Sequence, residues 1–331
     1  MDWILRPDSS SLVLCAGLSF HDDRDAHTHQ MMAKLSATLL ATTPSLSTPV
    51  RALCLHGWRT NANLMRLQTR QLLAAFPPGA IELEHVNAPF TSKKPADPSL
   101  ERLVAGPFHE WWDTIEEGGS NNQAHGFSSD AKVVSYNGLE KSINTLCSFI
   151  RNEAAKGRAF DVVIGFSQGG IMATILTALM ERGAAALDQP PFTNDSFAVP
   201  CGESLLPPSA AWKAVVLVST MMPRDTELRS TTCRIPSVVN ADPECGDRLL
   251  DIPLETPSCH IFGEADNMFP ASESLAKWWS GEKYTDAKLI LTHTAGHRFP
   301  PAGNQRLYEK TAEFVLRTCS KETRSFDRSR S

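Results

Sequence analysis

Ser167 stands in the sequence Gly165-Phe-Ser-Gln-Gly169, after an apolar run and before a helical pattern. The run Asp161–Ile164 predicts a buried strand, and the residues from Gly170 onward predict a helix. A strand-to-helix turn this tight favours glycine on both sides, and it lifts the serine hydroxyl above the sheet. Backbone N–H groups at the start of the helix can then bind an oxyanion. We therefore predict that Ser167 is a nucleophile rather than part of a structural glycine-rich turn.

A histidine is the expected partner of this serine. A serine hydroxyl needs an adjacent base that takes its proton during attack, and an imidazole titrates near neutrality. With this type of turn, the expected chain order is serine, acid, histidine. Ala295-Gly-His297 lies on the predicted loop between a strand that ends at Leu291 and the last helix. His293 is the rival base, but it sits closer to the strand end and has no adjoining glycine, so we predict His297.

The acid must hold the imidazole in its correct tautomer. Asp266 ends the sequence His260-Ile-Phe-Gly-Glu-Ala-Asp266, where a glycine-led turn after a predicted strand can aim a carboxylate at the loop of His297. Glu264 lies two residues away and competes for the role. Four other aspartates lack a preceding strand with a turn and are interpreted as surface charges: Asp242, Asp247, Asp251 and Asp286.

The sequence His56-Gly-Trp58 follows another predicted strand and is a candidate for half of an oxyanion hole. Glycine lets a backbone approach closely and turn an N–H group inward. The expected donors are the backbone N–H groups of Trp58 and Gln168. We expect His56 itself to brace the loop by hydrogen bonding and to take no part in proton transfer.

Apolar runs and helical patterns alternate along the chain, which predicts an α/β fold with a mostly parallel central sheet and helices on both faces. Strands are expected at Val50–Leu55, Ile81–Val86, Phe160–Ile164, Trp212–Val218, Ser258–Phe262 and Ala287–Leu291. Helices are expected at Asn63–Phe76, Tyr136–Ala155, Gly169–Met180, Ser272–Trp279 and Leu307–Arg317. The proline-rich stretches Ala184–Ala211 and Met221–Pro257 are either covers of the site or variable surface loops.

Composition sets the limits of the domain. Residues 1–48 lack sustained periodicity and are rich in Ser, Thr, Asp and His, which predicts a disordered extension. After this extension we expect one domain at 49–318 and a flexible tail at 319–331. The apolar run Ser11–Phe20 resembles the core of a signal peptide, but the segment before it carries two acidic residues and one basic residue. We therefore expect a cytoplasmic protein.

Charge and cysteine usage exclude several partners. The formal net charge is −5, and neither sign forms a block that could follow a phosphate backbone, so nucleic acid is not expected. No stretch approaches the roughly 20 apolar residues of a membrane span. The eight cysteines form no CxxC pair and are expected to be reduced, although Cys233 and Cys245 are spaced closely enough for a loop disulfide. The cluster His21–His29 lacks groups to orient metal ligands, so no metal is predicted.

The sequence resembles those of the FSH-type serine hydrolases, a family that includes fungal members. The ordered set of shared segments spans about residues 50 to 318: Leu55-His-Gly-Trp58, Asn87-Ala-Pro-Phe90, Trp111-Trp112, Gly138-Leu-Glu-Lys-Ser142, Asp161 to Gly169, His260 to Asp266 and Gly296-His297. The resemblance implies an α/β-hydrolase fold, no cofactor, and hydrolysis of a carboxylic ester or acyl thioester. Several fungal relatives act in polyketide pathways, which implies an acyl product of secondary metabolism, including a carrier-bound acyl chain, as a candidate substrate.

Two departures from the family pattern concern the substrate pocket. The family usually has a glycine where this chain has Thr220, and a second glycine where it has Ala295. Aromatic residues near the motifs could line an acyl pocket, although aromatics are more often core: Phe90, Trp111, Trp112 and Phe269, and also Trp58, Phe108 and Phe299. The rival functions are a catalytically silent binding module and a peptidase on the same fold.

Overall fold

The computed structural model describes residues 48–92, 94–117, 133–182, 206–225, 234–235, 247–248, 250, 253–281 and 287–320. The expected extension, except for its last residue Thr48, lies outside these ranges. So do most of the first proline-rich stretch, the cluster His21–His29, and the pair Cys233 and Cys245.

Six strands form one parallel sheet in the order β12-β11-β8-β7-β1-β2. Their bounds are Val50–Leu55 (β1), Ile81–Val86 (β2), Val162–Phe166 (β7), Ala214–Val218 (β8), Ser258–Gly263 (β11) and Lys288–His293 (β12). The four inner strands are buried along their whole length, as continuous apolar runs covered on both faces should be.

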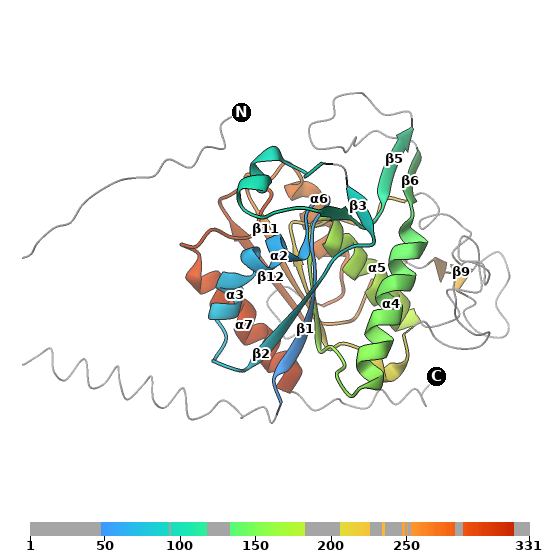
Figure 1. Cartoon of the computed structure of the whole chain (residues 1–331). Helices are drawn as coiled ribbons and strands as arrows, with labels where there is room; N and C mark the ends of the chain where they lie inside the picture. The colour runs from blue at the N-terminus through green and yellow to red at the C-terminus, as the bar shows by residue number, and fades with distance from the viewer. Residues whose placement is uncertain are drawn as a thin grey trace, which may run out of the picture. The chain divides into compact units, whose positions relative to one another are not determined.

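Helices cover both faces of the sheet (Figure 1). Their bounds are Ala62–Gln68 (α2), Arg70–Ala74 (α3), Leu139–Ala155 (α4), Gln168–Arg182 (α5), Phe269–Trp278 (α6) and Gln305–Ser320 (α7). Successive side chains of a strand point to opposite faces. Accordingly Val162 and Ile164 share a core with Phe314 of α7, whereas Val163 shares the other core with Ile143 of α4. The predicted α/β-hydrolase architecture is confirmed. None of the helices described here is both long and apolar enough to cross a bilayer.

The helix expected at Asn63–Phe76 is two helices, because the chain breaks at Thr69. The hydroxyl of Thr69 lies 2.9 Å from the carbonyl oxygen of Met65 and 2.9 Å from Nε2 of His85 on β2. This buried side chain is thus tied to the neighbouring strand as well as to its own helix. Helical backbone hydrogen bonds continue on both sides of Thr69, from its N–H group to Met65 and from the N–H group of Leu73 to its carbonyl, so the expected helix is interrupted only at this residue.

The helix expected from Tyr136 begins instead at Leu139. Tyr136 belongs to a strand, and Gly138 intervenes with φ 90°, which ends the extended segment. The remaining short elements were not predicted. They are β3 (Phe90–Ser92) paired with β4 (Phe108–Glu110), β5 (Asp113–Glu117) with β6 (Val133–Asn137), β9 (Arg234–Ile235) with β10 (Asp247–Arg248), all antiparallel, and the 3₁₀ turns η1 (Pro98–Arg102) and η3 (Pro208–Ala210).

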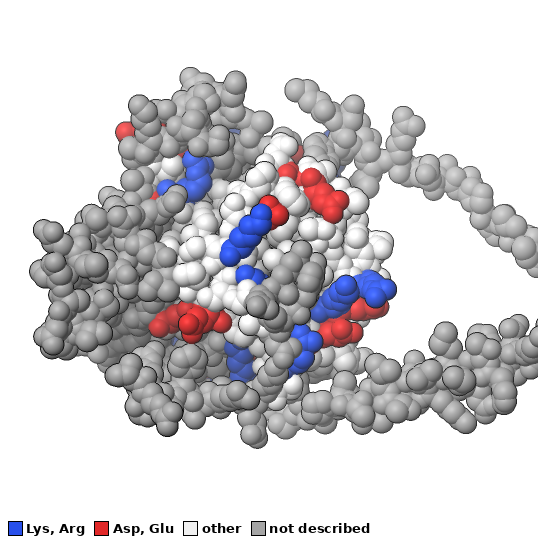
Figure 2. Space-filling model, turned by 180° about the vertical axis from the view of Figure 1, so that it is seen from behind, with Lys and Arg blue, Asp and Glu red and all other residues white. Residues whose placement is uncertain are grey.

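Figure 2 shows the face opposite to that of Figure 1, with Lys and Arg side chains interspersed among Asp and Glu side chains. On the described part of this face, no block of one sign forms. Glu153 at the end of α4 forms ion pairs with Arg51, Lys156 and Arg158.

The turn from β7 to α5 lies directly against the end of β1. A Cβ atom on Gly169 would overlap the carbonyl oxygen of Leu55 and would lie 2.5 Å from that of His56. Real Cβ atoms do not approach backbone this closely. Glycine at this position is therefore what allows the helix to start beside the first strand.

We predict that Gly169→Ala destabilises the fold by about 3 kcal/mol or more, because an added methyl group in a tightly packed site forces the backbone to shift. Thermal and urea unfolding measure this. Gly303→Ala is the matched control, since a Cβ there meets nothing within 4 Å. Equal unfolding midpoints for the two variants would show that the turn accommodates a Cβ atom at position 169 without a destabilising shift of the backbone.

Candidate active site

Ser167, His297 and Asp266 form one hydrogen-bonded line at the carboxyl edge of the sheet. Oγ of Ser167 lies 2.9 Å from Nε2 of His297, and Nδ1 of His297 lies 2.8 Å from Oδ2 of Asp266. The three residues follow β7, β12 and β11, whose carboxyl ends lie at the same edge because these strands are parallel. A hydroxyl, an imidazole and a carboxylate in this order can activate the hydroxyl as a nucleophile.

Ser167 has an unusual backbone conformation, with φ 52°, which a residue other than glycine adopts only when its surroundings enforce it. Its N–H group donates to the carbonyl of Val218 at 3.0 Å. Its own carbonyl accepts from the N–H groups of Gly170 and Ile171 and from the hydroxyl of Thr220. These four hydrogen bonds hold the strained turn and fix the direction of the hydroxyl.

Asp266 is ionised and buried. Burial raises the pKa of its carboxyl group, but the hydrogen bond and the charge of His297, together with the N–H group of Met268 at 2.8 Å, outweigh that effect and hold the pKa below its ordinary value. An ionised carboxylate only accepts hydrogen bonds, so Nδ1 of His297 must donate. In the neutral imidazole, Nε2 is then the acceptor that faces the hydroxyl of Ser167.

The turn that carries Asp266 and the loop that carries His297 are joined through their backbones. The N–H group of Glu264 donates to the carbonyl of His293 at 2.7 Å, and that of Ala265 donates to the carbonyl of Ala295 at 3.3 Å. A Cβ atom on Gly263 would overlap the carbonyl oxygen of Ala295. The glycine before the acid therefore permits the close contact that sets the distance between acid and base.

The rival residues point elsewhere. Nδ1 of the buried His293 accepts from the N–H group of Ala295 at 3.2 Å, and burial lowers the pKa of its imidazole. The exposed carboxylate of Glu264 accepts from the hydroxyl of Thr292 at 2.9 Å. Neither side chain contacts Ser167 through a hydrogen bond in the described part of the chain, so the geometry favours His297 and Asp266.

The expected oxyanion donors belong to the loop after β1 and to the start of α5. A Cβ atom on Gly57 would lie 3.4 Å from Cβ of Ser167, which places the loop after β1 directly beside the hydroxyl. Gln168 is the first residue of α5, where helical N–H groups have no partner within the helix. Within the residues that the structure describes, the backbone N–H groups of Trp58 and Gln168 have no hydrogen-bond acceptor. Both are thus free to bind an anionic oxygen.

His56 braces the loop, as expected. Its Nε2 accepts from the N–H group of Ala88 at 3.0 Å, so the proton is on Nδ1, which lies 2.8 Å from the carbonyl oxygen of Gly57. The imidazole is fully buried. Burial lowers its pKa to about 4, against the opposing effect of the hydrogen bond to Gly57. His56 is therefore neutral near neutral pH.

We predict that His56 makes the stability of the protein pH-dependent. Its pKa is about 4 in the folded chain against an ordinary value of 6.5, so the unfolded chain binds more protons between these values. The contribution of His56 is fully present above pH 6.5 and is lost progressively as the pH falls toward about 4, by an amount on the order of 3 kcal/mol. Urea unfolding over this range should show a smaller pH dependence for His56→Gln. The same pH dependence in both proteins would contradict the assignment.

The expected pocket residues divide into two groups. Trp111 and Trp112 are 0% and 1% exposed, and they lie in the core, so they offer no surface to a ligand in this structure. Phe90 and Phe269 are partly exposed. The ring of Phe90 packs against Gly138, and that of Phe269 meets the ring of Phe262 at 5.2 Å.

Three contacts of the site were missed by sequence reasoning. Thr220, the first departure from the family pattern, donates its hydroxyl to Ser167 and fills the space beside Gly170. The carboxamide of Gln168 binds the backbone of Trp111 and Trp112. The hydroxyl of Ser142 donates to the carbonyl of Trp111. Ser142, Gln168 and the tryptophan pair lie in the segments shared with the family, and Thr220 is a departure from its pattern, but neither signal identified a contact partner. Among the described residues, no group of three or more potential metal ligands occurs.

Comparison with known proteins agrees with this geometry. A family model described as "Serine hydrolase (FSH1)" matches residues 46–307, most of the chain. The chain belongs to the FSH1 serine hydrolase family. Relatives with similar sequences include "Esterase OVCA2" of Homo sapiens, 27% identical over 266 residues that cover 78% of this chain and 92% of the relative. "Esterase C25G4.2" of Caenorhabditis elegans is 27% identical over 271 residues, which cover 80% and 92%.

Solved structures similar to this FSH1 family member include Zea mays acyl-protein thioesterase 2, with a TM-score of 0.47 and 16% identity. The match covers 82% of this chain and 96% of that one. A second is esterase PE8, with a TM-score of 0.46 and 14% identity over 82% and 93% of the two chains.

Proposed function

We propose that this serine hydrolase cleaves a carboxylic ester or acyl thioester through an acyl-serine intermediate. The observation that carries the proposal is the unbroken line from Ser167 through His297 to the buried Asp266. The backbone N–H groups of Trp58 and Gln168, which have no acceptor among the described residues, support it. The named relatives that are esterases support the ester class.

The proposed reaction assigns one role to each group of the site. His297 takes the proton of Ser167 as its oxygen attacks the acyl carbonyl, and Asp266 stabilises the imidazolium that forms. The N–H groups of Trp58 and Gln168 bind the oxyanion of the tetrahedral intermediate. His297 then gives its proton to the leaving alcohol or thiol. A water molecule, deprotonated by the same imidazole, hydrolyses the acyl-serine and restores the enzyme.

The proposed chemistry specifies neither the acyl group nor the leaving group of the substrate. The resemblance to the family adds a polyketide-type or carrier-bound acyl chain to the candidate substrates. Turnover of p-nitrophenyl esters and acyl thioesters of graded chain length separates these classes. Hydrolysis of small esters also excludes the silent binding module, and cleavage of peptides alone would favour the peptidase.

We predict that Ser167→Ala abolishes both ester turnover and labelling by a fluorophosphonate probe, because no other hydroxyl is bonded to His297 among the described residues. Ser148→Ala, which removes an exposed hydroxyl from α4, should leave both unchanged. Labelling that persists in Ser167→Ala would place the nucleophile elsewhere and would overturn the proposal.

We predict that Asp266→Asn lowers kcat by about 10⁴-fold with little change in KM, because an amide donor next to Nδ1 favours the wrong tautomer of His297. Steady-state kinetics measure this. Glu264→Gln is the matched control, since it neutralises an exposed carboxylate two residues away and should retain kcat within about twofold. If Glu264→Gln were the inactive variant, Glu264 would be the acid.

A further inference from the structure

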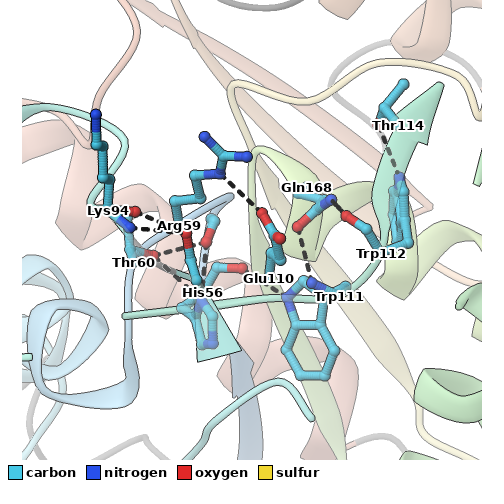
Figure 3. A network of polar contacts seen from close by, with 11 residues as sticks. His56, Arg59, Thr60, Lys94, Glu110, Trp111, Trp112, Thr114 and Gln168 are labelled. Carbon is cyan, nitrogen blue, oxygen red and sulfur yellow. Dashed lines mark hydrogen bonds and ion pairs between the residues drawn. The ribbon is translucent and has the colours of Figure 1, made fainter. Parts of the chain in front are cut away.

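The two proposed oxyanion donors lie on separate segments, and a third segment joins them. Trp58 follows β1, and Gln168 begins α5. The residues Trp111 and Trp112, between β4 and β5, are hydrogen-bonded to both of these segments (Figure 3). The distance between the donors is therefore fixed by more than the direct contact at Gly169.

The carboxamide of Gln168 makes two hydrogen bonds to the backbone of this third segment. Its Oε1 accepts from the N–H group of Trp111 at 3.0 Å, and its Nε2 donates to the carbonyl of Trp112 at 2.9 Å. The side chain is 3% exposed. Only a group with one acceptor and one donor at the same spacing reproduces both bonds in this dry environment.

The indole of Trp111 makes the connection to the other donor. Its Nε1 donates to the carbonyl of His56 at 2.8 Å, two residues before Trp58, and its ring centroid lies 5.2 Å from that of His56. His56 in turn is held by Ala88. Trp111 thus binds Gln168 through its backbone and the loop of Trp58 through its side chain.

The third segment is itself held in place. The hydroxyl of Ser142 on α4 donates to the carbonyl of Trp111, and the ring of Trp112 stacks on that of Tyr136 with centroids 4.5 Å apart. A rigid support of this kind is what keeps two dipoles aimed at one point. Displacement of a donor by as little as 1 Å can cost about 10²-fold in rate.

We propose that the carboxamide of Gln168 and the indole of Trp111 are positioning residues that set the distance between the two oxyanion donors. The inference rests on the proposed function, because it assumes that the N–H groups of Trp58 and Gln168 bind the oxyanion. It assigns to Gln168 two separate tasks, one for its backbone and one for its side chain.

Three variants test the inference in the full-length protein. Gln168→Met keeps the volume of the side chain but loses both hydrogen bonds, so kcat for p-nitrophenyl butyrate should fall about 10- to 100-fold while KM changes by less than about twofold. Trp111→Phe removes the indole N–H donor together with part of the ring volume, and it should lower kcat in the same selective way.

Gln168→Glu supplies a readout that a purely structural role would not change. As a neutral acid, glutamate accepts from Trp111 and donates to Trp112, as the amide does. As a carboxylate, it faces the carbonyl of Trp112 with a second negative oxygen and also repels a developing oxyanion. The ratio of its kcat to that of the unchanged protein should therefore be near one at mildly acidic pH and should fall as the pH rises.

Thr114→Val is the matched control, because it removes a hydrogen bond to the indole of Trp112 without touching either donor segment. It should retain kcat within about twofold. The inference is overturned if folded Gln168→Met and Trp111→Phe retain full kcat, or if Gln168→Glu and Gln168→Met lose kcat by the same factor at every pH. If Gln168→Met does not fold, Trp111→Phe decides. Loss of turnover in Ser167→Ala, measured beside these variants, tests the proposed function separately.

Discussion

The close backbone contact between the start of α5 and the end of β1 is the constraint on which the rest of the site depends. Because Gly169 carries no side chain, the first turn of the helix lies against the carbonyl groups of Leu55 and His56. That contact brings the hydroxyl of Ser167 next to the loop after β1. The parallel order of β7, β8, β11 and β12 then brings the acid and the base to the same edge, where backbone hydrogen bonds join their two loops.

Burial gives two histidines at this edge opposite roles. His56 has no exposed surface and both ring nitrogens are engaged, so it stays neutral and braces a loop. The side chain of His297 is 35% exposed and is bonded to a carboxylate that is only 1% exposed. A buried ionised partner and an accessible imidazole together allow a proton to be accepted and released at the surface, while the charge that stabilises it stays fixed.

Much of this arrangement could be predicted from the sequence, because it depends on local patterns. The strands at Val50–Leu55 and Val162–Phe166 are mostly apolar runs with clear ends, and residues of the candidate site follow both of them directly. What could not be predicted depends on partners from distant segments. The side chain of Thr69 contacts His85 on β2, and the ring of Trp112 stacks on that of Tyr136. The strand Asp113–Glu117 is mostly polar, so it carries no apolar alternation that would reveal it.

The hydrogen bonds that connect β1, the tryptophan pair and α5 link segments that lie far apart in the sequence. The hydrogen bonds that Trp111 donates to His56 and to Gln168 connect positions that are 55 and 57 residues apart, and the bond between Ser167 and His297 spans 130 residues. Closing loops of this length costs conformational entropy, which the completed fold must offset. In a chain whose last strand and following loop have not docked, the hydroxyl of Ser167 lacks its hydrogen bond to the imidazole of His297.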